Sequence, residues 1–185
     1  MRSRSNAALF WPVLVVVLAF DVITKAIAER ALMRGIPEEV LGDVVRLRLV
    51  YNPGAAFGFD LGPQSRWIFA VLTIVALVIL ARLYRSTPAG HAARAVALAL
   101  VCAGAVGNLI DRVRSFFGVV DFIDVGIGDA RWPTFNVADM AVSVGAGLLA
   151  WVLWQEDRSM QAAASVVSPV AVPASASGGE PGDLA

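Results

Sequence analysis

The chain has 185 residues, of which 58% are hydrophobic and 16% are charged, and its formal net charge is zero. Apolar composition of this kind is typical of an integral membrane protein. The balanced charge, with no dense basic face, argues against nucleic-acid binding, and a single cysteine excludes an intramolecular disulfide and a cysteine-cluster metal site.

Four apolar stretches are close to the roughly 20 residues that a helix needs to cross a bilayer. They cover residues 7–28, 67–84, 95–111 and 137–154. Arginines at the ends of these stretches can extend toward the lipid headgroups, which compensates for the shorter ones. The pattern predicts an all-α membrane protein in which residues 1–158 form one four-transmembrane-helix bundle.

The charge of the connections predicts how this bundle is oriented. The loop from Arg82 to Arg94 is rich in arginine and contains no acidic residue, and such loops usually remain in the cytoplasm. We therefore expect both termini to be cytoplasmic and the regions 29–65 and 114–135 to be extracytoplasmic. Residues 159–185 are rich in alanine, serine, proline and glycine, and we expect them to form a disordered cytoplasmic tail.

Two segments outside the apolar stretches have the pattern of β-strands. Polar and apolar residues alternate from Val45 to Tyr51, which predicts a strand with one buried face, and the turn-forming sequence Asn52-Pro53-Gly54 follows. A second strand is predicted at Phe117–Val125. Because two short strands on the same side can satisfy each other's backbone groups, we expect a small extracytoplasmic β-sheet.

Polar residues inside the first and third apolar stretches require an explanation, since charges in a bilayer are costly unless they are paired or hydrated. Asp21 and Lys25 are four residues apart, so a helix places them on one face. They form either a neutralised ion pair or the polar wall of a substrate cleft. Gly104 can allow close helix packing, but packing does not explain Asn108 and Arg112.

Carboxylates near the last apolar stretch indicate acid–base chemistry. Asn136 has the properties of a helix N-cap, and Asp139 follows at the third helical position, where the helix dipole is positive. Asp121 and Asp124 belong to the second predicted strand and point to opposite faces, so at most one of them can join Asp139. Our hypothesis is that Asp121 and Asp139 are the working pair.

Two carboxyl groups in one site do not readily ionise together, so one of them keeps a proton while the other acts as a base. The ionised group can take a proton from a water that attacks a scissile carbonyl, and the protonated group can bond the carbonyl oxygen. This chemistry needs neither a metal nor a covalent intermediate. The single histidine, His91, gives no support to a zinc site with several histidines.

Five sequence blocks occur in the order that is known from one enzyme family. They are Asp21 with Lys25, VYNPGAAFG at Val50–Gly58, GAVGNLIDR at Gly104–Arg112, VVDFID at Val119–Asp124 and FNVAD at Phe135–Asp139. Across roughly residues 10 to 155 the chain resembles the prolipoprotein signal peptidases, also called lipoprotein or type II signal peptidases, which form aspartic peptidase family A8. The resemblance implies a membrane endopeptidase that removes the signal peptide from diacylglyceryl-modified prolipoproteins by cleavage before the lipidated cysteine.

The resemblance also implies roles for individual residues. Asp121 and Asp139 match the catalytic aspartates, and Asp21 and Lys25 match residues that support the first helix of the site. The positions that match residues lining or supporting the substrate site are Asn52, Gly54, Gly104, Asn108, Arg112 and Asn136. We assign Asp111 a structural role with its neighbour Arg112.

The family further implies a place in the bacterial inner membrane, with the active site near the extracytoplasmic face. It implies no cofactor, contact with membrane lipid and inhibition by globomycin-type cyclic peptides. Three alternatives remain open: a small transporter or proton-conducting subunit, a non-catalytic scaffold that uses its glycines for packing, and a serine–lysine peptidase with Lys25 as the base.

Overall fold

The structure is a computed structural model that describes residues 6–54, 62 and 64–167. Its elements in chain order are α1 (Asn6–Ala31), β1 (Pro37–Leu41), β2 (Val45–Asn52), α2 (Ser65–Arg85), α3 (Ala92–Arg114), β3 (Val119–Ile127), β4 (Ala130–Arg131) and α4 (Val137–Val167). The chain divides into two compact units, Met1–Val152 and Leu153–Ala185. The sheet, the bundle and the candidate site all belong to the first unit.

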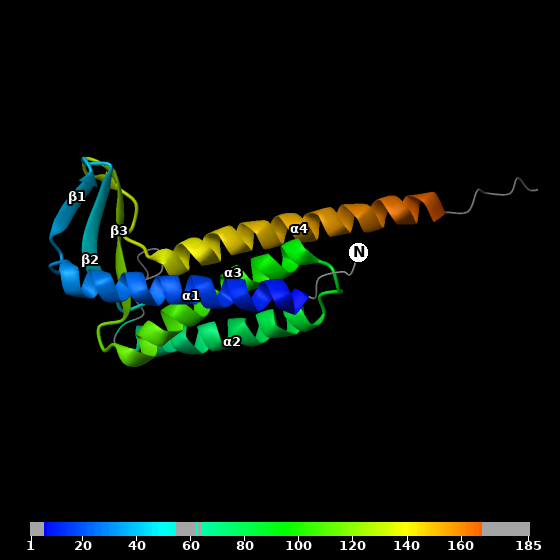
Figure 1. Cartoon of the computed structure of the whole chain (residues 1–185), viewed down its shortest axis with the longest axis horizontal. Helices are drawn as coiled ribbons and strands as arrows, with labels where there is room; N and C mark the ends of the chain where they lie inside the picture. The colour runs from blue at the N-terminus through cyan, green and yellow to red at the C-terminus, as the bar shows by residue number, and fades with distance from the viewer. Residues whose placement is uncertain (1–5, 55–61, 63, 168–185) are drawn as a thin grey trace, which may run out of the picture. The chain divides into compact units, whose positions relative to one another are not determined.

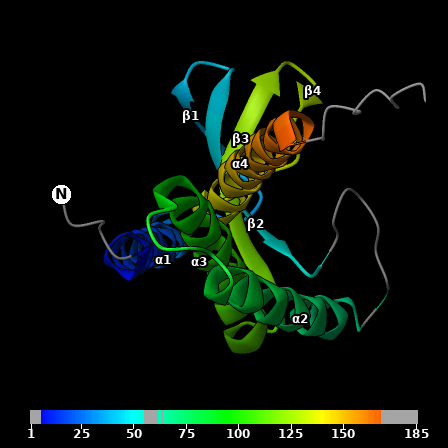
Figure 2. The same cartoon turned by 90° about the vertical axis from the view of Figure 1, so that its right-hand side faces the viewer.

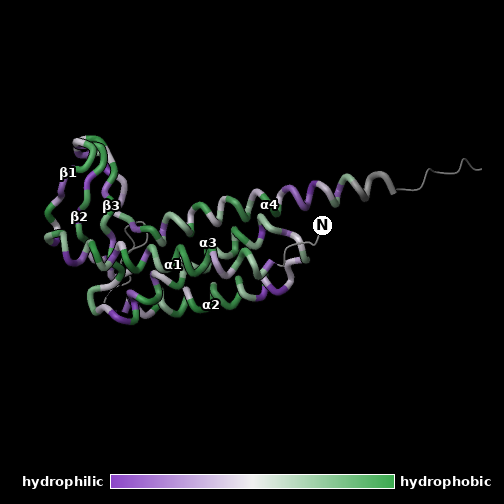
Figure 3. The backbone as a smooth tube through the Cα atoms, viewed as in Figure 1, coloured by the Kyte–Doolittle hydropathy of each residue, from purple (hydrophilic) through white to green (hydrophobic). Residues whose placement is uncertain are grey.

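Within the described residues, four helices are long and apolar enough to cross a membrane, and the chain is a multi-pass membrane protein. Their hydrophobic residues occupy the middle of the helices, while hydrophilic residues gather at the ends and in the sheet (Figure 3). The predicted architecture of four transmembrane helices with a small sheet is confirmed. The helices of the first unit begin earlier or end later than the apolar stretches, since backbone hydrogen bonding continues into the polar ends.

The third helix occupies the interior of the bundle (Figure 2). Its buried residues are small or medium in size, including Ala95, Ala99 and Ala103, so neighbouring helices can approach it closely. The outward faces of α1 and α2 carry exposed aliphatic side chains such as Val16 and Val71. Exposed apolar residues of this kind face lipid in a membrane protein.

The four described strands form one antiparallel sheet with the order β1-β2-β3-β4, which lies at one end of the helices (Figure 1). The central pair, β2 and β3, runs from Val45 opposite Val125 to Asn52 opposite Val119. The two predicted strands therefore exist and pair with each other. The sequence did not reveal β1 or β4, because every residue of β1 is exposed and β4 has only two residues.

The C-terminal region differs from the prediction in part. We expected disorder from residue 159, but α4 continues to Val167. No proline or glycine interrupts the chain between Gln155 and Val167, and Gln161 Nε2 donates to Asp157 Oδ2 at 2.7 Å, one turn earlier. These local features favour a helix despite the low-complexity composition. The rest of the tail, residues 168–185, lies outside the described residues.

Candidate active site

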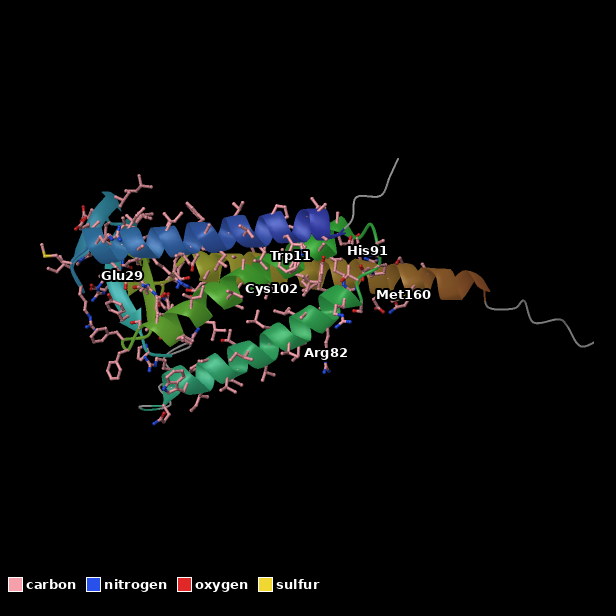
Figure 4. The ribbon with its side chains drawn as sticks, turned by 60° about the horizontal axis from the view of Figure 1, so that its bottom comes forward. Trp11, Glu29, Arg82, His91, Cys102 and Met160 are labelled. Atoms are coloured by element: carbon pink, nitrogen blue, oxygen red, sulfur yellow. The ribbon has the colours of Figure 1, made fainter. Side chains whose placement is uncertain are left out.

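The residues singled out in the sequence gather at the end of the bundle that carries the sheet. Glu29, near the C-terminus of α1, lies at this end, whereas Arg82 and His91 lie at the opposite end (Figure 4). Strands β2 and β3 cross the helices here, close to the beginning of α4 (Figure 1). Residues from strands, helices and connecting segments can therefore share one site.

Asp121 lies near the beginning of β3, and its side chain is buried, with 3% of its surface exposed. Its Oδ1 accepts a hydrogen bond of 2.7 Å from Asn136 Nδ2. Asp124 takes a different partner, since its Oδ1 accepts a hydrogen bond of 2.6 Å from Arg131 Nε. The two aspartates thus have separate environments, as expected for strand positions of opposite parity.

Asp139 is held by reciprocal capping at the start of α4. Its backbone N–H donates to Asn136 Oδ1 at 2.9 Å, and its Oδ2 accepts from the backbone N–H of Asn136 at 3.2 Å. This is the arrangement of a capping box. Its Oδ1 accepts a further hydrogen bond of 2.8 Å from Asn108 Nδ2. Both carboxylate oxygens of Asp139 therefore accept hydrogen bonds, which fix the orientation of this side chain.

A cavity of about 360 Å³ brings the two aspartates together with three of the predicted supporting residues. Its lining consists of Asn52, Gly54, Phe69, Arg112, Asp121, Trp132, Pro133, Thr134, Phe135, Asp139, Val142 and Ser143. Residues 132–134 were not singled out in the sequence, although they directly precede the FNVAD block. Proximity to the FNVAD block was the only available signal, because an irregular segment has no periodicity.

The turn after β2 explains two of these lining residues. Asn52 Oδ1 accepts from the backbone N–H of Gly54 at 3.0 Å. Gly54 has φ +125°, and a Cβ built there would lie 2.8 Å from Phe69 Cδ2, so both the backbone angle and the available space require glycine. Residues Ala55–Gly58, the second half of the VYNPGAAFG block, lie outside the described residues.

Lys25 occupies the centre of a buried polar network beneath the cavity. Its Nζ lies 2.8 Å from Asp21 Oδ2, 2.9 Å from Asp111 Oδ2 and 2.9 Å from Asn108 Oδ1. Only 1% of the Lys25 surface is exposed. Of the two interpretations of Asp21 and Lys25, the ion pair is therefore correct, and neither residue lines the cavity.

This network also holds the start of α4. Asp21 Oδ1 accepts a hydrogen bond of 2.8 Å from the backbone N–H of Ala138, the residue before Asp139. Lys25 Nζ donates to Asn108 Oδ1, and the same oxygen accepts from Asn136 Nδ2 at 3.2 Å. The side-chain nitrogen of Asn108 donates to Asp139 Oδ1. Asp21 and Lys25 thus orient the residues that surround Asp139, although neither of these two charged residues lines the cavity.

The structural pairing of Asp111 with Arg112 that we expected is wrong. Asp111 instead pairs with Lys25 and, at 2.9 Å, with Arg114 Nε, and it accepts from the backbone N–H of Val120 at 3.3 Å. Consecutive residues of an α-helix point about 100° apart, so the two neighbours cannot face each other. Arg112 lines the cavity, and its Nη1 donates to Asn108 O at 3.1 Å.

Gly104 is not among the residues that line this cavity. It lies where α3 meets α4, and a Cβ at this position would overlap Ala138 O and lie 2.7 Å from Val142 Cγ2. The close approach of the two helices requires the absence of a side chain. Gly104 therefore supports the site by packing, since Ala138 and Val142 flank Asp139 on α4.

Gly104→Ala should reduce the free energy of unfolding by about 1–3 kcal/mol, because the added methyl forces α3 and α4 apart. Gly147→Ala is the matched control: a Cβ there meets nothing within 4 Å, and alanine stabilises a helix interior by about 0.5–1 kcal/mol relative to glycine. Both variants can be compared by thermal unfolding in detergent. Equal stability of the two variants would show that the close contact at Gly104 has no energetic importance.

The environment of Asp121 favours its protonated form. Burial and the nearby negative charge of Asp139 raise the pKa of Asp121 from 3.8 to about 7, against the opposing effects of hydrogen bonds from Asn52 and Asn136 and the charge of Lys25. A raised pKa is what the acid of a catalytic pair of carboxyls needs.

Among the described residues, no group of three or more histidine, cysteine, aspartate or glutamate side chains has the arrangement of a metal site. Cys102 lies in α3 and is buried with Phe10, Leu98 and Ala99 in an apolar cluster. These apolar contacts agree with its interpretation as apolar filling.

Sequence comparison identifies one family. The family described as signal peptidase (SPase) II matches residues 13–155. Among proteins named lipoprotein signal peptidase, that of Cupriavidus necator is 44% identical over 154 residues, covering 80% of this chain and 85% of the relative. The corresponding protein of Syntrophotalea carbinolica is 42% identical over 147 residues, covering 79% of this chain and 91% of the relative.

Two solved structures share the fold, and both are described as bacterial membrane enzyme structures obtained by the in meso method. The structure at 2.3 Å resolution has a TM-score of 0.75 and 29% sequence identity, and the match covers 93% of this chain and 99% of that chain. The structure at 1.9 Å resolution has a TM-score of 0.73 and 32% identity, with coverage of 83% and 97%.

Proposed function

The chain belongs to the signal peptidase II family and is an aspartic peptidase of the membrane, and on this basis we propose that Asp121 and Asp139 form its catalytic dyad. The observation that carries this proposal is that both carboxyls line one cavity and are bridged by Asn136. The Asn136 side chain bonds Asp121, and the side chain and backbone of Asn136 both bond Asp139. A single residue thus orients both groups, as a shared reaction requires.

In the proposed mechanism Asp139 is the base and Asp121 is the acid. Burial keeps the proton on Asp121, and the hydrogen bonds that both Asp139 oxygens accept hold the second carboxyl in position. Asp139 takes a proton from a water molecule, which attacks the scissile carbonyl carbon. Asp121 donates a hydrogen bond to the carbonyl oxygen and stabilises the charge that develops on it.

Collapse of the tetrahedral intermediate breaks the carbon–nitrogen bond. The proton that Asp139 has accepted passes to the leaving amine, so each carboxyl returns to its initial state after one turnover. The supporting residues have separate tasks in this scheme. Asn52 and Asn136 bond Asp121, Asn108 bonds Asp139, and Arg112 brings a positive charge to the cavity wall.

The proposed substrates are prolipoproteins whose cysteine carries a diacylglyceryl group, with cleavage immediately before that cysteine. Two features support a substrate held partly in lipid: the cavity lies at the end of the spanning helices, and apolar side chains such as Phe69 and Val142 line it beside the aspartates. Globomycin-type cyclic peptides, which the family resemblance suggests as inhibitors, would bind in the same cavity.

We place the enzyme in the bacterial cytoplasmic membrane with the sheet and dyad on the extracytoplasmic side. The arginine-rich connection between α2 and α3 lies at the end of the bundle opposite Glu29 and the sheet, and such connections usually remain in the cytoplasm (Figure 4). This orientation puts the dyad on the side where the lipidated cysteine of an exported precursor emerges.

The transporter alternative requires polar groups along the whole length of the bundle. In the described part of the chain, the interior near the opposite end is instead the apolar cluster around Phe10, Leu98 and Ala99. The buried ion pairs of Lys25 lie near the sheet. This one-sided distribution favours a site that opens at one membrane surface.

Paired turnover of a lipidated and an unlipidated precursor tests the proposed function. Purified protein in lipid vesicles should cut the diacylglyceryl-modified precursor with a kcat/KM higher by about 100-fold or more, since the acyl chains position the scissile bond at the dyad. Equal rates would remove the lipid from recognition and leave a general intramembrane aspartic peptidase as the better description. No cleavage of either precursor would contradict the proposed function itself.

A further inference from the structure

Ser143 has a position that the mechanism above does not use. It lies on α4 four residues after Asp139, so the two side chains share one face of the helix. Ser143 lines the cavity of the dyad and also a second cavity of about 330 Å³. The second cavity is lined by Trp132, Phe135, Asp139, Met140, Ser143 and Val144. Ser143 therefore stands where the two cavities meet.

The hydroxyl of Ser143 forms no hydrogen bond within the described structure. Other hydroxyls in the spanning helices behave differently: Thr24 Oγ1 donates to Phe20 O at 2.8 Å and Thr73 Oγ1 donates to Phe69 O at 2.7 Å, each one turn earlier in its own helix. Ser143 is exposed, so its hydroxyl can be reached from the cavities that it lines. The Ser143 hydroxyl is thus available to a group that enters the cavities.

The chemistry of the second cavity limits what that group can be. Met140 and Val144 are exposed on the lipid-facing side of α4, and most of the lining is aromatic or aliphatic. Such a cavity suits an acyl chain. The only strong hydrogen-bond acceptor that an acyl chain brings with it is the carbonyl of its ester, which lies between the apolar chain and the glyceryl group.

The distance along α4 agrees with this occupant. Four residues of α-helix span about 6 Å, so Ser143 lies about one turn from Asp139, the carboxylate that activates the attacking water. The bonds from the scissile amide through the cysteine thioether to the glyceryl ester can bridge a span of this size. An ester carbonyl can consequently reach Ser143 while the peptide bond remains at the dyad.

We infer that Ser143 is a specificity-determining residue whose hydroxyl donates a hydrogen bond to an ester carbonyl of the substrate's diacylglyceryl group, at the junction of the two cavities. This inference rests on the proposed function. It predicts that the site distinguishes an acyl ester from an alkyl chain of equal length, because only the ester offers a carbonyl acceptor.

Two substrates that differ only at the ester test the inference. One precursor carries ester-linked diacylglyceryl and the other carries ether-linked dialkylglyceryl with the same chain length. Wild-type protein should cut the ester-linked precursor with a kcat/KM about five-fold higher, the effect of one neutral hydrogen bond, mainly through a lower KM. Ser143→Ala should abolish this preference, and Ser143→Thr, which keeps a hydroxyl, should restore it.

Thr73→Ala is the matched control, because its hydroxyl is already bonded within α2 and it lines neither cavity. This variant should keep the wild-type preference for the ester. If Ser143→Ala slows both substrates equally, the hydroxyl bonds a peptide carbonyl instead and the inference is wrong; an unchanged preference in Ser143→Ala also overturns it. Failure of the wild-type protein to cut either precursor would count against the proposed function and not against Ser143 alone.

Discussion

Asp121→Asn and Asp139→Asn should each lower kcat/KM for a diacylglyceryl-modified precursor by about 10²–10⁴-fold, because asparagine keeps the shape of aspartate but cannot exchange the proton. The two variants should remain folded. An amide at position 121 can still accept from Asn136, and an amide at position 139 can still accept from Asn108. Cleavage in reconstituted membranes, with thermal unfolding measured on the same preparations, separates lost chemistry from lost structure.

Asp124→Asn is the matched control for the two dyad variants. Asp124 is a buried aspartate of the same strand, but it pairs with Arg131 and does not line the cavity. The substitution leaves Arg131 without its buried counter-charge, so we expect lower stability with most of kcat retained. An inactive Asp124→Asn together with an active Asp121→Asn would reverse the assignment of the catalytic aspartate.

The same assignment predicts the alkaline limit of activity. The active form needs the proton on Asp121, whose pKa is raised to about 7 by burial and by Asp139. Below this pKa the proton is present, and above it the proton is lost, so kcat/KM should fall about tenfold per pH unit above about pH 7. A profile that stays flat between pH 7 and pH 9 would contradict the role of Asp121 as the acid.

Lys25→Met should lower the free energy of unfolding by about 3–5 kcal/mol, since it leaves the buried carboxylates Asp21 and Asp111 without their shared counter-ion. Activity should fall as well. Asn108 loses the ammonium that bonds its Oδ1, and its amide is then less firmly directed at Asp139. Chemical unfolding in detergent, followed by tryptophan fluorescence, measures the change in stability.

Arg114→Met provides the matched comparison for Lys25→Met. Arg114 also pairs with Asp111, but 44% of its side-chain surface is exposed, and removal of an exposed partner typically changes stability by at most about 1 kcal/mol. Adding Asp21→Asn to Lys25→Met should recover part of the loss, because one of the two unpaired charges disappears. Strictly additive effects of Lys25→Met and Asp21→Asn would indicate that the two residues are not coupled in the folded protein.

Interactions between residues close in the chain were accessible from the sequence. The spacing of Asp21 and Lys25 predicts their ion pair, and the spacing of Asn136 and Asp139 predicts the cap at the start of α4. Both follow from the period of the α-helix, which brings residues three or four positions apart to one face. The separation of Asp121 from Asp124 follows in the same way from the period of a strand.

Interactions between distant segments were not accessible in this way. The second carboxylate partner of Lys25 is Asp111, on another helix, and the neighbour Arg112 points elsewhere. Helical periodicity shows that Asp111 and Arg112 diverge, but it does not show which helix faces each of them. The same holds for Trp132 and Ser143, which became part of the site only through the packing of their segments against the cavity.

The sequence by itself determined the membrane class, the four spans, the two central strands and, through five ordered blocks, the family. These features depend on composition, on local periodicity and on motifs that are read along the chain. Only the tertiary structure decided that Gly104 is a helix contact, that Lys25 joins two carboxylates and that Ser143 connects two cavities. These features depend on which faces meet when the helices pack, and no single segment contains that information.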